Sequence, residues 1–255
     1  MAAMVHKDKI KERNVEQFTM LSHFQIESYG LSDIGISRSN NEDAWAELPE
    51  YGFYVLADGI GGHKAGEIAA KEATLQLCDL VDAFFQTSPM PSLEEVCEKM
   101  SQHLINTNQW LRKLSRTYHE LEGMGTTICI LWFLEKKLVY SYLGDSRIYR
   151  YRQGKLERLT QDHAHKDKKN GKNILTQALG TASQIHPEIY TVPIQKGDLY
   201  VVCSDGLSDS ITDAQIEKTC AKSMSLKQTA FELVDLAKMG LGNDNITVLL
   251  IHRSE

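Results

Sequence analysis

The chain has 255 residues, of which 42% are hydrophobic and 24% are charged, proportions that are typical of a soluble globular protein with a substantial core. Its formal net charge of -6 argues against a general affinity for nucleic acid or for an anionic membrane surface. No stretch approaches the ~18 apolar residues of a membrane-spanning helix, and the polar start of the chain has no signal-peptide pattern. We therefore expect a cytoplasmic protein.

The cysteines are scattered along the chain and form no Cys-x-x-Cys pair. They are Cys78, Cys97, Cys129, Cys203 and Cys220. An odd number of separated cysteines, some of them within apolar periodic segments, argues for reduced and buried thiols rather than for a disulfide framework. This pattern agrees with a cytoplasmic location.

The first part of the chain is predicted to form an arm followed by short strands. Residues 1–22 are polar and of mixed charge, and we expect them to form an N-terminal arm. Strands are predicted over 24–29 and 34–36, followed by a turn-like stretch over 37–43. The next run, 51–57, is almost continuously apolar and bounded by glycine, which is typical of a strand buried on both faces.

Two long helices are predicted after this strand. Apolar residues recur at helical spacing from Ala69 to Phe84, with charged residues between them, which predicts an amphipathic helix that ends before Pro89. Ser92 is a suitable N-cap for the second helix, and an apolar stripe begins directly after it. Both apolar stripes are predicted to face the core.

The rest of the chain is mainly β-structure, with two further helices near its end. Strands are predicted over 127–134, 138–143, 147–151, 156–159, 189–194, 199–203 and 246–251. Helices are predicted over 214–221 and 226–237, and the polar, basic stretch 161–173 is predicted to be an exposed loop.

Strands and helices occur in separate blocks, which favours an α+β fold with mostly antiparallel sheets and helices outside them. Strands that are apolar on both faces need cover on both sides. A four-layer α-β-β-α sandwich, with two sheets flanked by helices, satisfies this requirement. Because no linker or repeat interrupts the pattern, we expect a single domain over 23–255.

Five aspartates lie at the ends of predicted strands or in the glycine and asparagine turns beside them. They are Asp43, Asp58, Asp145, Asp205 and Asp244. Taken singly, an Asp-Gly or Asp-Asn pair is explained by ordinary turn chemistry. Five carboxylates that converged at one end of the sheets would repel one another strongly unless cations lay between them.

Oxygen ligands without a Cys or His partner suit hard cations such as Mg²⁺ and Mn²⁺. Two such ions sharing one carboxylate would lower the pKa of a bound water and place it for in-line attack on phosphorus. The forked guanidinium of Arg38 would then clamp the phosphate. Taken alone, Arg38 is also consistent with an ordinary surface arginine.

Seven short segments contain or accompany these aspartates. They are Arg38-Ser39-Asn40-Asn41-Glu42-Asp43, Leu56-Ala57-Asp58-Gly59-Ile60-Gly61-Gly62-His63, Gly125-Thr126-Thr127, Gly144-Asp145-Ser146-Arg147, Leu159-Thr160-Gln161-Asp162-His163, Cys203-Ser204-Asp205-Gly206-Leu207 and Asp244-Asn245-Ile246-Thr247-Val248. In order and spacing they resemble the motif set of the PPM/PP2C-type protein serine/threonine phosphatases, especially the bacterial branch. The resemblance covers nearly the whole chain, from about residue 29 to 251.

The resemblance implies a β-sandwich flanked by helices, with two or three Mn²⁺ or Mg²⁺ ions bound at one end. By family position, Asp58 would bridge two ions, and the backbone carbonyl of Gly59 would bind one of them. Asp205 and Asp244 would hold the first ion.

The remaining site residues are also assigned by the resemblance. Asp43, together with Glu42, would support the second ion through water molecules. Asp145 matches a position that, with Asp205, holds a third ion in bacterial members. Arg38 matches the arginine that binds the phosphate group of the substrate.

Two departures from the family pattern concern the general acid and the flap beside the site. Animal relatives have a histidine directly after the Asp-Gly pair, where this chain has Ile60. His63 is therefore a candidate acid, although a structural role at the start of a helix is equally consistent with it. Bacterial relatives have a longer, partly helical flap, whereas only a short basic loop over 163–172 is present here. This loop would attract phosphate or acidic sequence, or it is a solvated loop without a role.

The predicted function is hydrolysis of phosphoserine and phosphothreonine in proteins by a monomeric, cytoplasmic signalling enzyme that opposes a Ser/Thr kinase. Hydrolysis of small phosphomonoesters or nucleotides is an alternative, although the chain has no GxxxxGK[ST] phosphate cradle. A catalytically silent phosphoprotein-binding module is a further alternative. Loss of Asp58, Asp205 or Asp244 would indicate such a module, and all three are present.

Overall fold

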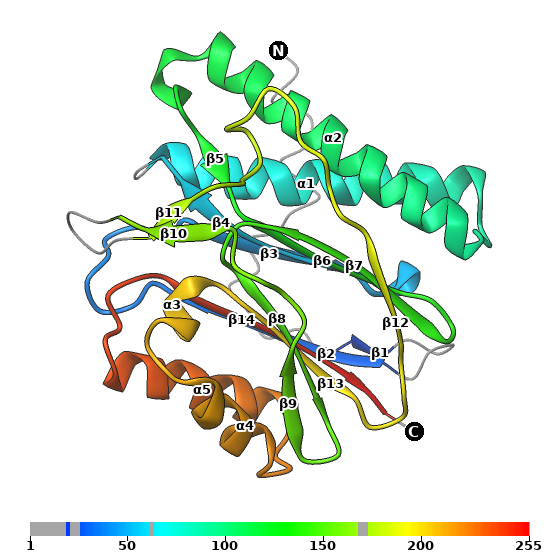
Figure 1. The fold of residues 1–255 in the computed structure, drawn as a ribbon, viewed down its shortest axis with the longest axis vertical. Coiled ribbons are helices and arrows are strands. Elements are labelled where there is room, and N and C mark those ends of the chain that lie inside the picture. Colours follow the sequence, from blue (N-terminus) through cyan, green and yellow to red (C-terminus); the bar gives the residue numbers. More distant parts are fainter. Residues whose placement is uncertain (1–18, 21–25, 62–63, 168–172, 255) are drawn as a thin grey trace.

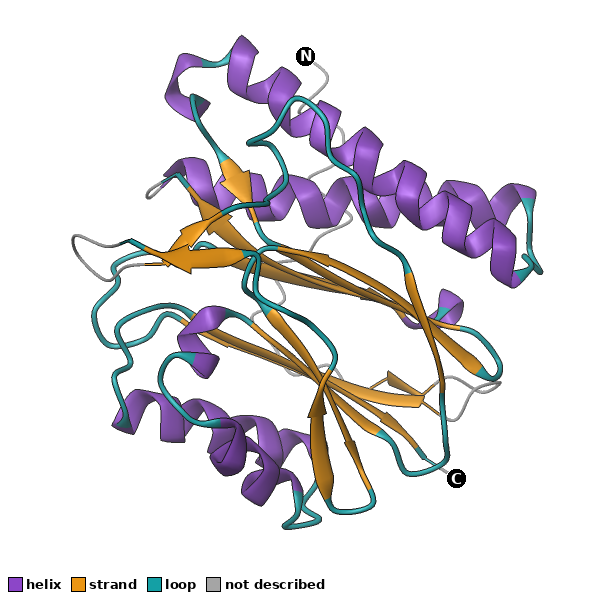
Figure 2. Cartoon of the chain, in the orientation of Figure 1, coloured by secondary structure: helices purple, strands orange, loops and turns teal. Residues whose placement is uncertain are grey.

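Two antiparallel sheets lie face to face between two layers of helices in the computed structural model of the chain (Figure 1). The structure describes residues 19–20, 26–61, 64–167 and 173–254. The predicted α+β fold, a four-layer α-β-β-α sandwich, is confirmed (Figure 2). No helix in the described ranges has both the length and the apolar character of a membrane span.

The first sheet has the strand order β1-β2-β14-β13-β8-β9, and neighbouring strands are antiparallel. Its strands are β1 (Thr19–Met20), β2 (Ile26–Asp33), β14 (Ile246–Arg253), β13 (Leu199–Cys203), β8 (Arg147–Arg152) and β9 (Lys155–Arg158). The helices on its outer face are α3 (Asp205–Ser208), α4 (Asp213–Cys220) and α5 (Leu226–Met239). Apolar residues of these helices, including Leu207, Ile216 and Leu233, pack against Val201 and Val248 of the sheet.

The second sheet has the order β12-β7-β6-β4-β3, and β5 pairs with β4 beside it. Its strands are β12 (Tyr190–Pro193), β7 (Lys137–Leu143), β6 (Ile128–Phe133), β4 (Phe53–Ile60), β3 (Asp43–Leu48) and β5 (Gly125–Thr126). Its outer face is covered by α1 (Lys64–Thr87) and α2 (Leu93–Thr117). Short 3-10 helices lie at Pro49–Tyr51 and His119–Leu121.

The predicted cap of the second long helix is confirmed. The Ser92 side chain accepts a hydrogen bond from the backbone of Glu95, and the Glu95 side chain accepts one from the backbone of Ser92. This capping box satisfies two backbone N–H groups that would otherwise lack partners at the start of α2. The buried residues of α1 and α2 then face the second sheet, as their apolar stripes predict.

Strand β4 is buried on both faces, as its apolar sequence predicts. Phe53 and Val55 face α1 and α2, whereas Tyr54 and Leu56 face the space between the two sheets. Successive side chains in a strand point to opposite faces, so Asp58 has the same orientation as Tyr54 and Leu56. The carboxylate therefore lies at the end of the apolar core between the sheets.

The predicted strand over 34–36 is wrong, because this segment is a turn. Gly35 has a φ of +76°, and a Cβ at this position would lie 2.1 Å from the carbonyl oxygen of Asp244. The backbone N–H of Ile36 donates to the carbonyl of Gly242. Packing against the 242–244 loop, which is distant in sequence, therefore decides the conformation.

The predicted exposed loop over 161–173 is also corrected in part. Residues Ala164–Lys166 form β10 and pair antiparallel with β11, Asn173–Leu175. These strands have the sequences Ala-His-Lys and Asn-Ile-Leu, in which apolar and polar residues do not alternate, so the pattern that predicts a strand is absent. Residues 168–172, between the two strands, lie outside the described part of the chain.

The predicted N-terminal arm lies mostly outside the described residues. Within it, Thr19 and Met20 form β1, which pairs with Ser28 and Glu27 of β2. The edge of the first sheet is therefore formed by a short strand from this part of the chain.

Candidate active site

Asp43 and Asp58 lie opposite each other on the antiparallel strands β3 and β4. The backbone N–H of Gly59 donates to the carbonyl of Glu42 at 3.1 Å, so Glu42 and Gly59 form a hydrogen-bonded pair. Because such pairs alternate with non-hydrogen-bonded pairs along antiparallel strands, the next pair, Asp43 and Asp58, is a non-hydrogen-bonded pair. Side chains of such pairs approach more closely than those of hydrogen-bonded pairs. The register thus brings two carboxylates together at the end of the core.

Asp43 also connects the two sheets. Its Oδ2 accepts hydrogen bonds from the hydroxyl of Ser204, at the end of β13, at 2.8 Å and from that of Thr247, on β14, at 2.6 Å. Burial raises the pKa of Asp43 to about 6, although these two hydrogen bonds partly oppose the shift. A buried polar layer therefore separates the apolar core from the group of aspartates.

The backbone around Asp58 is held by two threonines of the neighbouring segment. The Asp58 carbonyl accepts hydrogen bonds from the Thr126 hydroxyl and from the Thr127 N–H, both at 2.8 Å. The Asp58 N–H donates to the Thr127 hydroxyl at 3.0 Å. These contacts fix the end of β4 where Asp58 begins the glycine-containing turn.

Four other aspartates act on the charge of Asp58. Burial raises its pKa well above the usual range, and the negative charges of Asp43, Asp205, Asp244 and Asp145 raise it further. The structure therefore brings together all five aspartates that the sequence indicates, from segments that are far apart in the chain.

Asp205 and Asp145 belong to the same group of charges. Burial raises the pKa of Asp205 well above its usual range, with further contributions from Asp145 and Asp244. Burial also raises the pKa of Asp145 to about 6, and Arg147 opposes this shift. Protein cations therefore compensate these carboxylates incompletely.

Arg38 lies at the mouth of the site and contacts one of the aspartates. Its Nη2 donates to Oδ2 of Asp244 at 2.6 Å, and its Nη1 lies 3.9 Å from Oε1 of Glu42. The Arg38 side chain is 44% exposed, so part of its guanidinium remains open to an incoming anion. Arg38 thus lies beside the aspartates, as its predicted role requires.

Asn245 holds the Arg38 loop in place. Its Nδ2 donates to the carbonyls of Ile34 at 3.0 Å and Asn40 at 2.8 Å, and its Oδ1 accepts from the Glu42 N–H at 2.8 Å. The side chain is 3% exposed. One buried amide therefore fixes the start and the end of the loop that carries Arg38, next to Asp244.

The glycines that follow Asp58 and Asp205 are required by close packing. A Cβ on Gly59 would lie 2.2 Å from the carbonyl oxygen of Gly66, in the first turn of α1. A Cβ on Gly206 would lie 2.0 Å from the carbonyl oxygen of Asn245. Any larger residue at either place would displace backbone that borders the aspartates.

Sequence reasoning missed Asp209, which is one helical turn after Asp205 at the end of α3. Its negative charge raises the pKa of Asp205 and of Asp145, so it lies at the edge of the same group. The spacing of four residues from Asp205, on a helix that begins at the strand end, is the signal that could have identified it. His63, the candidate general acid indicated by the sequence, lies outside the described residues.

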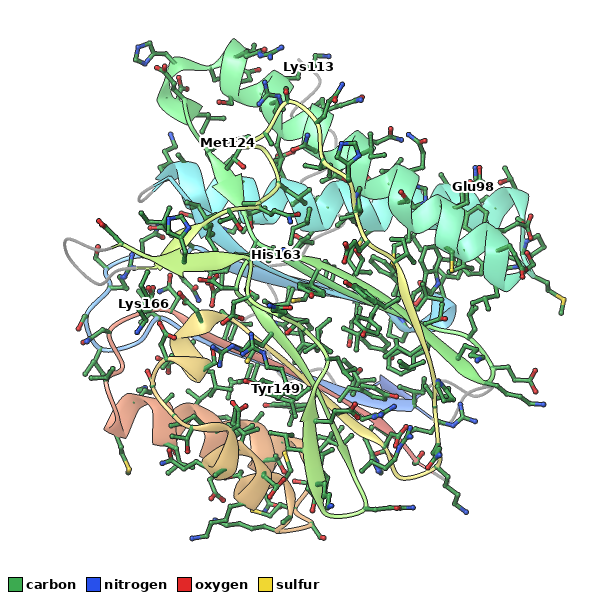
Figure 3. All side chains as sticks on the ribbon, viewed as in Figure 1. Glu98, Lys113, Met124, Tyr149, His163 and Lys166 are labelled. Atoms are coloured by element: carbon green, nitrogen blue, oxygen red, sulfur yellow. The ribbon has the colours of Figure 1, made fainter. Side chains whose placement is uncertain are left out.

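The β10–β11 hairpin is attached beside the aspartates. The backbone N–H of His163 donates to the carbonyl of Gly144, next to Asp145, and the N–H of Thr176 donates to the carbonyl of His163. Figure 3 labels His163 at the base of the hairpin and Lys166 at the end of β10. The charge of Lys166 acts on Asp209, so a basic side chain of the hairpin faces the edge of the site.

The aspartate group fits hard divalent cations. Its donors are carboxylate and carbonyl oxygens, which Mg²⁺ and Mn²⁺ prefer, and a cation would relieve the repulsion that raises these pKa values. Within the described ranges, no three His, Cys, Asp or Glu side chains are arranged so that they alone could hold an ion. Mg²⁺ in particular keeps several water ligands and needs only one or two carboxylates, so binding of such an ion does not require three of these side chains to converge on one point.

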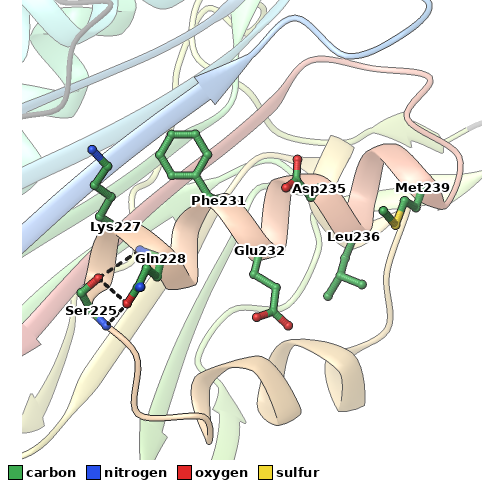
Figure 4. Close-up of a pocket in the computed structure, with 8 residues that line it drawn as sticks. All are labelled: Ser225, Lys227, Gln228, Phe231, Glu232, Asp235, Leu236 and Met239. Carbon is green, nitrogen blue, oxygen red and sulfur yellow. Dashed lines mark hydrogen bonds between the residues drawn. The ribbon is translucent and has the colours of Figure 1, made fainter.

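A groove away from these aspartates runs along the exposed side of α5 (Figure 4). Its volume is about 770 Å³, and its lining includes Lys227, Phe231, Asp235 and Met239. None of the aspartates described above lines this groove. Its mixed apolar and charged lining offers no convergent set of oxygen ligands, so we assign the chemistry to the aspartate group.

The sequence profile of the protein phosphatase 2C family matches residues 36–238. The chain belongs to this family. The protein phosphatase PhpP of Streptococcus pneumoniae, a curated relative, is 33% identical over 242 residues, which cover 88% of this chain and 96% of the relative. The resemblance inferred from the seven segments is therefore confirmed.

Solved structures of protein phosphatase 2C relatives share the fold. The serine/threonine phosphatase of S. agalactiae has a TM-score of 0.81 and 31% identity, covering 90% of this chain and 100% of that structure. The catalytic domain of the serine threonine protein phosphatase PstP, in complex with 2 manganese ions, has a TM-score of 0.78 and 28% identity, covering 90% of this chain and 99% of that structure.

Proposed function

We propose that the chain is a metal-dependent phosphatase that removes phosphate from phosphoserine and phosphothreonine in proteins. The observation that carries this proposal is the convergence of four other aspartate charges on Asp58, at the end of the core between the sheets. Family membership and relatives named as serine/threonine phosphatases support the same activity.

The aspartates have distinct proposed roles. Two Mn²⁺ or Mg²⁺ ions would be held by Asp58, which both would share, by the carbonyl of Gly59, and by Asp205 and Asp244 at the first ion. Asp43, whose Oδ2 already accepts hydrogen bonds from Ser204 and Thr247, would support the second ion through water. When bound, such ions lower the pKa of a coordinated water and neutralise phosphate charge.

Asp145, together with Asp205, is the proposed location of a third ion. The mutual repulsion of these two carboxylates, which raises the pKa of Asp205, supports this assignment because a cation between them would remove it. The number of ions is thus proposed to be two or three.

Arg38 binds the phosphate of the substrate. Its guanidinium is exposed and lies at the mouth of the site, where Asp244 orients it. A planar guanidinium can donate two parallel hydrogen bonds to phosphate oxygens. His63 remains the proposed proton donor to the leaving hydroxyl, since Ile60 stands where animal relatives have histidine.

The cellular setting is proposed as follows. The enzyme consists of an arm over 1–22 and one catalytic domain over 23–255, and it acts as a monomer. It works in the cytoplasm, in signalling, on proteins phosphorylated by a Ser/Thr kinase. Reduced cysteines and the modest negative charge support this location.

The test is hydrolysis of a phosphothreonine peptide and of an aryl phosphate by the purified full-length chain, with Mn²⁺ and with a chelator. We expect turnover of both substrates with Mn²⁺ and none with chelator. Activity that is indifferent to metal would overturn the two-ion mechanism. Hydrolysis of nucleotides in preference to the phosphopeptide would favour the alternative of a small-molecule phosphatase, and metal binding without any hydrolysis would favour a silent binding module.

A further inference from the structure

The side chain of Asn108, in the middle of α2, is buried and uses both ends of its amide. It is 1% exposed. Its Oδ1 accepts a hydrogen bond from the N–H of Gly180 at 2.8 Å, and its Nδ2 donates to the carbonyl of Ala182 at 3.1 Å. Both partners belong to the segment 178–182, which follows the β10–β11 hairpin. In Figure 1 the chain after β11 rises to α2 before it descends to β12.

The segment 178–182 in turn supports the backbone of the active site. Leu179 and Thr126 exchange two backbone hydrogen bonds, at 3.0 and 2.9 Å. Thr126 is opposite Gly59 in the β4–β5 pairing, and its hydroxyl donates to the Asp58 carbonyl at 2.8 Å. Leu179 and Thr126 are both fully buried. A continuous chain of hydrogen bonds thus connects Asn108 to Asp58.

Gly180 makes this connection geometrically strict. Its φ is +85°, a region that other residues rarely adopt, and a Cβ would lie 2.8 Å from the carbonyl oxygen of Met124. The backbone at Gly180 therefore has little freedom to shift toward Met124. If the Asn108 amide were removed, the Gly180 N–H and the Ala182 carbonyl would lose their partner in a buried place, which favours displacement of the segment.

We propose that Asn108 is a positioning residue for the ion site, although it is in a helix on the outer layer. Its amide fixes segment 178–182, and Leu179 of this segment is hydrogen-bonded to the backbone of Thr126. The hydroxyl of Thr126 in turn fixes the carbonyl of Asp58, next to Gly59. This inference rests on the proposed function, because Asp58 and Gly59 are there assigned as ion ligands. Residues that support ligands in this way typically change metal affinity by about 10-fold or more when removed.

The first experiment compares Asn108→Ala with a matched control, Arg112→Ala, in the full-length chain. Arg112 lies one turn further along α2 and donates to the carbonyl of Thr181 in the same segment at 3.3 Å, but it is at the surface. Titration calorimetry with Mn²⁺ alone should show affinity about 10-fold weaker for Asn108→Ala and unchanged for Arg112→Ala. The kcat for a phosphothreonine peptide should fall while its KM changes little.

Unfolding measurements on the metal-free variants separate positioning from general stability. A purely structural role predicts a lower melting temperature with unchanged Mn²⁺ affinity and kcat, and this result would overturn the inference. Gly180→Ala, which disturbs the same contact from the other side, should weaken Mn²⁺ binding similarly. The effects of the two substitutions should not add in the double variant, because they remove one connection.

The second experiment needs no substitution and therefore decides the question even if Asn108→Ala fails to fold. Coupling between two sites is reciprocal, so Mn²⁺ binding should slow hydrogen exchange at the amides of Leu179 and Gly180. Exchange at Glu95, whose amide bonds to Ser92 at the far end of α2, should not change. Equal effects at all these amides, or none at Leu179 and Gly180, would overturn the inference. The calorimetry and the hydrogen exchange use Mn²⁺ without substrate, so failure to hydrolyse phosphopeptides would overturn the proposed function alone.

Discussion

Strand β13 has a fully buried aspartate before it and a half-buried aspartate after it, and the two are compensated in opposite ways. Asp198, just before the strand, is fully buried, and both of its carboxylate oxygens accept hydrogen bonds from Arg152 at 2.6 Å. The backbone of Gln195 and the hydroxyl of Tyr200 also donate to it. Asp205, just after the strand, instead has Asp145 and Asp244 as its main charged neighbours.

The contrast indicates how the fold would distinguish a structural charge, Asp198, from one with the proposed role in ion binding, Asp205. A buried carboxylate that only closes the core is matched by a guanidinium and by neutral donors within the chain. A group of carboxylates without enough protein cations stores repulsion, which an external cation relieves. The incomplete compensation around Asp58 and Asp205 is therefore the physical signal that supports the proposed ion site.

The largest expected effect is loss of turnover on Asp58→Asn. The substitution keeps the size of the side chain but removes the proposed bridging charge, so kcat for a phosphothreonine peptide with Mn²⁺ should fall about 10³-fold. The fold should persist, because the substitution also removes a repelling charge, and circular dichroism would verify this. Wild-type activity of the folded variant would contradict the bridging role.

Asp198→Asn should have the opposite profile. The substitution leaves Arg152 without its charged partner at the edge of the core, and the free energy of unfolding should fall by about 3 kcal/mol. Urea denaturation measures this loss. Turnover per folded molecule should stay at the wild-type level, since Asp198 lies at the other end of β13. A large loss of kcat with unchanged stability would reverse the proposed distinction between the two ends.

Stabilisation by Mn²⁺ should depend on pH with a definite sign. Burial raises the pKa values of Asp43 and Asp145 to about 6. Both carboxyls are therefore protonated in the metal-free folded state at low pH, and the stability that this protonation gives is lost as pH rises through about 6. Mn²⁺ at about 100-fold above its Kd should therefore stabilise the protein by about 3 kcal/mol near pH 7.5 and by less near pH 5.

The measurement is the difference between urea midpoints with and without Mn²⁺ at each pH. Desolvation lowers the pKa of the buried imidazole of His103 to about 4. The folded protein therefore loses stability as pH falls below about 6.5, because the unfolded chain then binds a proton that the buried imidazole does not. This contribution is present with and without metal and cancels in the difference. A stabilisation by Mn²⁺ that is larger near pH 5 would contradict the account of the aspartate group.

The smallest expected effect concerns Arg38. Arg38 pairs with Asp244 in the aspartate group and is exposed, whereas Arg152 pairs with the buried Asp198 at the other end of β13. Arg38→Ala should lower kcat/KM for the phosphopeptide by about 10-fold, mainly through KM, since an exposed guanidinium contributes one charge-assisted contact to phosphate. Arg38→Lys should restore part of the loss. Steady-state kinetics at saturating Mn²⁺ measures both. Unchanged kinetics of Arg38→Ala would indicate an ordinary surface arginine.

The sequence by itself determined those features in which local pattern and structure agree. The apolar run that ends at Asp58 is a strand buried on both faces, and the Ser92 cap starts α2 at the predicted residue. The five aspartates could be predicted as one group because each follows or precedes such a strand, and strand ends of stacked sheets meet at one edge. Separate blocks of strands and helices likewise indicated the four layers.

Only the tertiary structure decided the features that depend on contacts between distant segments. The turn at Gly35 is imposed by Asp244, more than two hundred residues later. The link from Asp43 to Ser204 and Thr247 depends on how the two sheets stack. Asn108 has no local pattern that distinguishes it from other polar residues of α2, because its role is set by the segment that packs on it. Sequence periodicity specifies which face of an element is buried, whereas the partner on that face is specified by the fold.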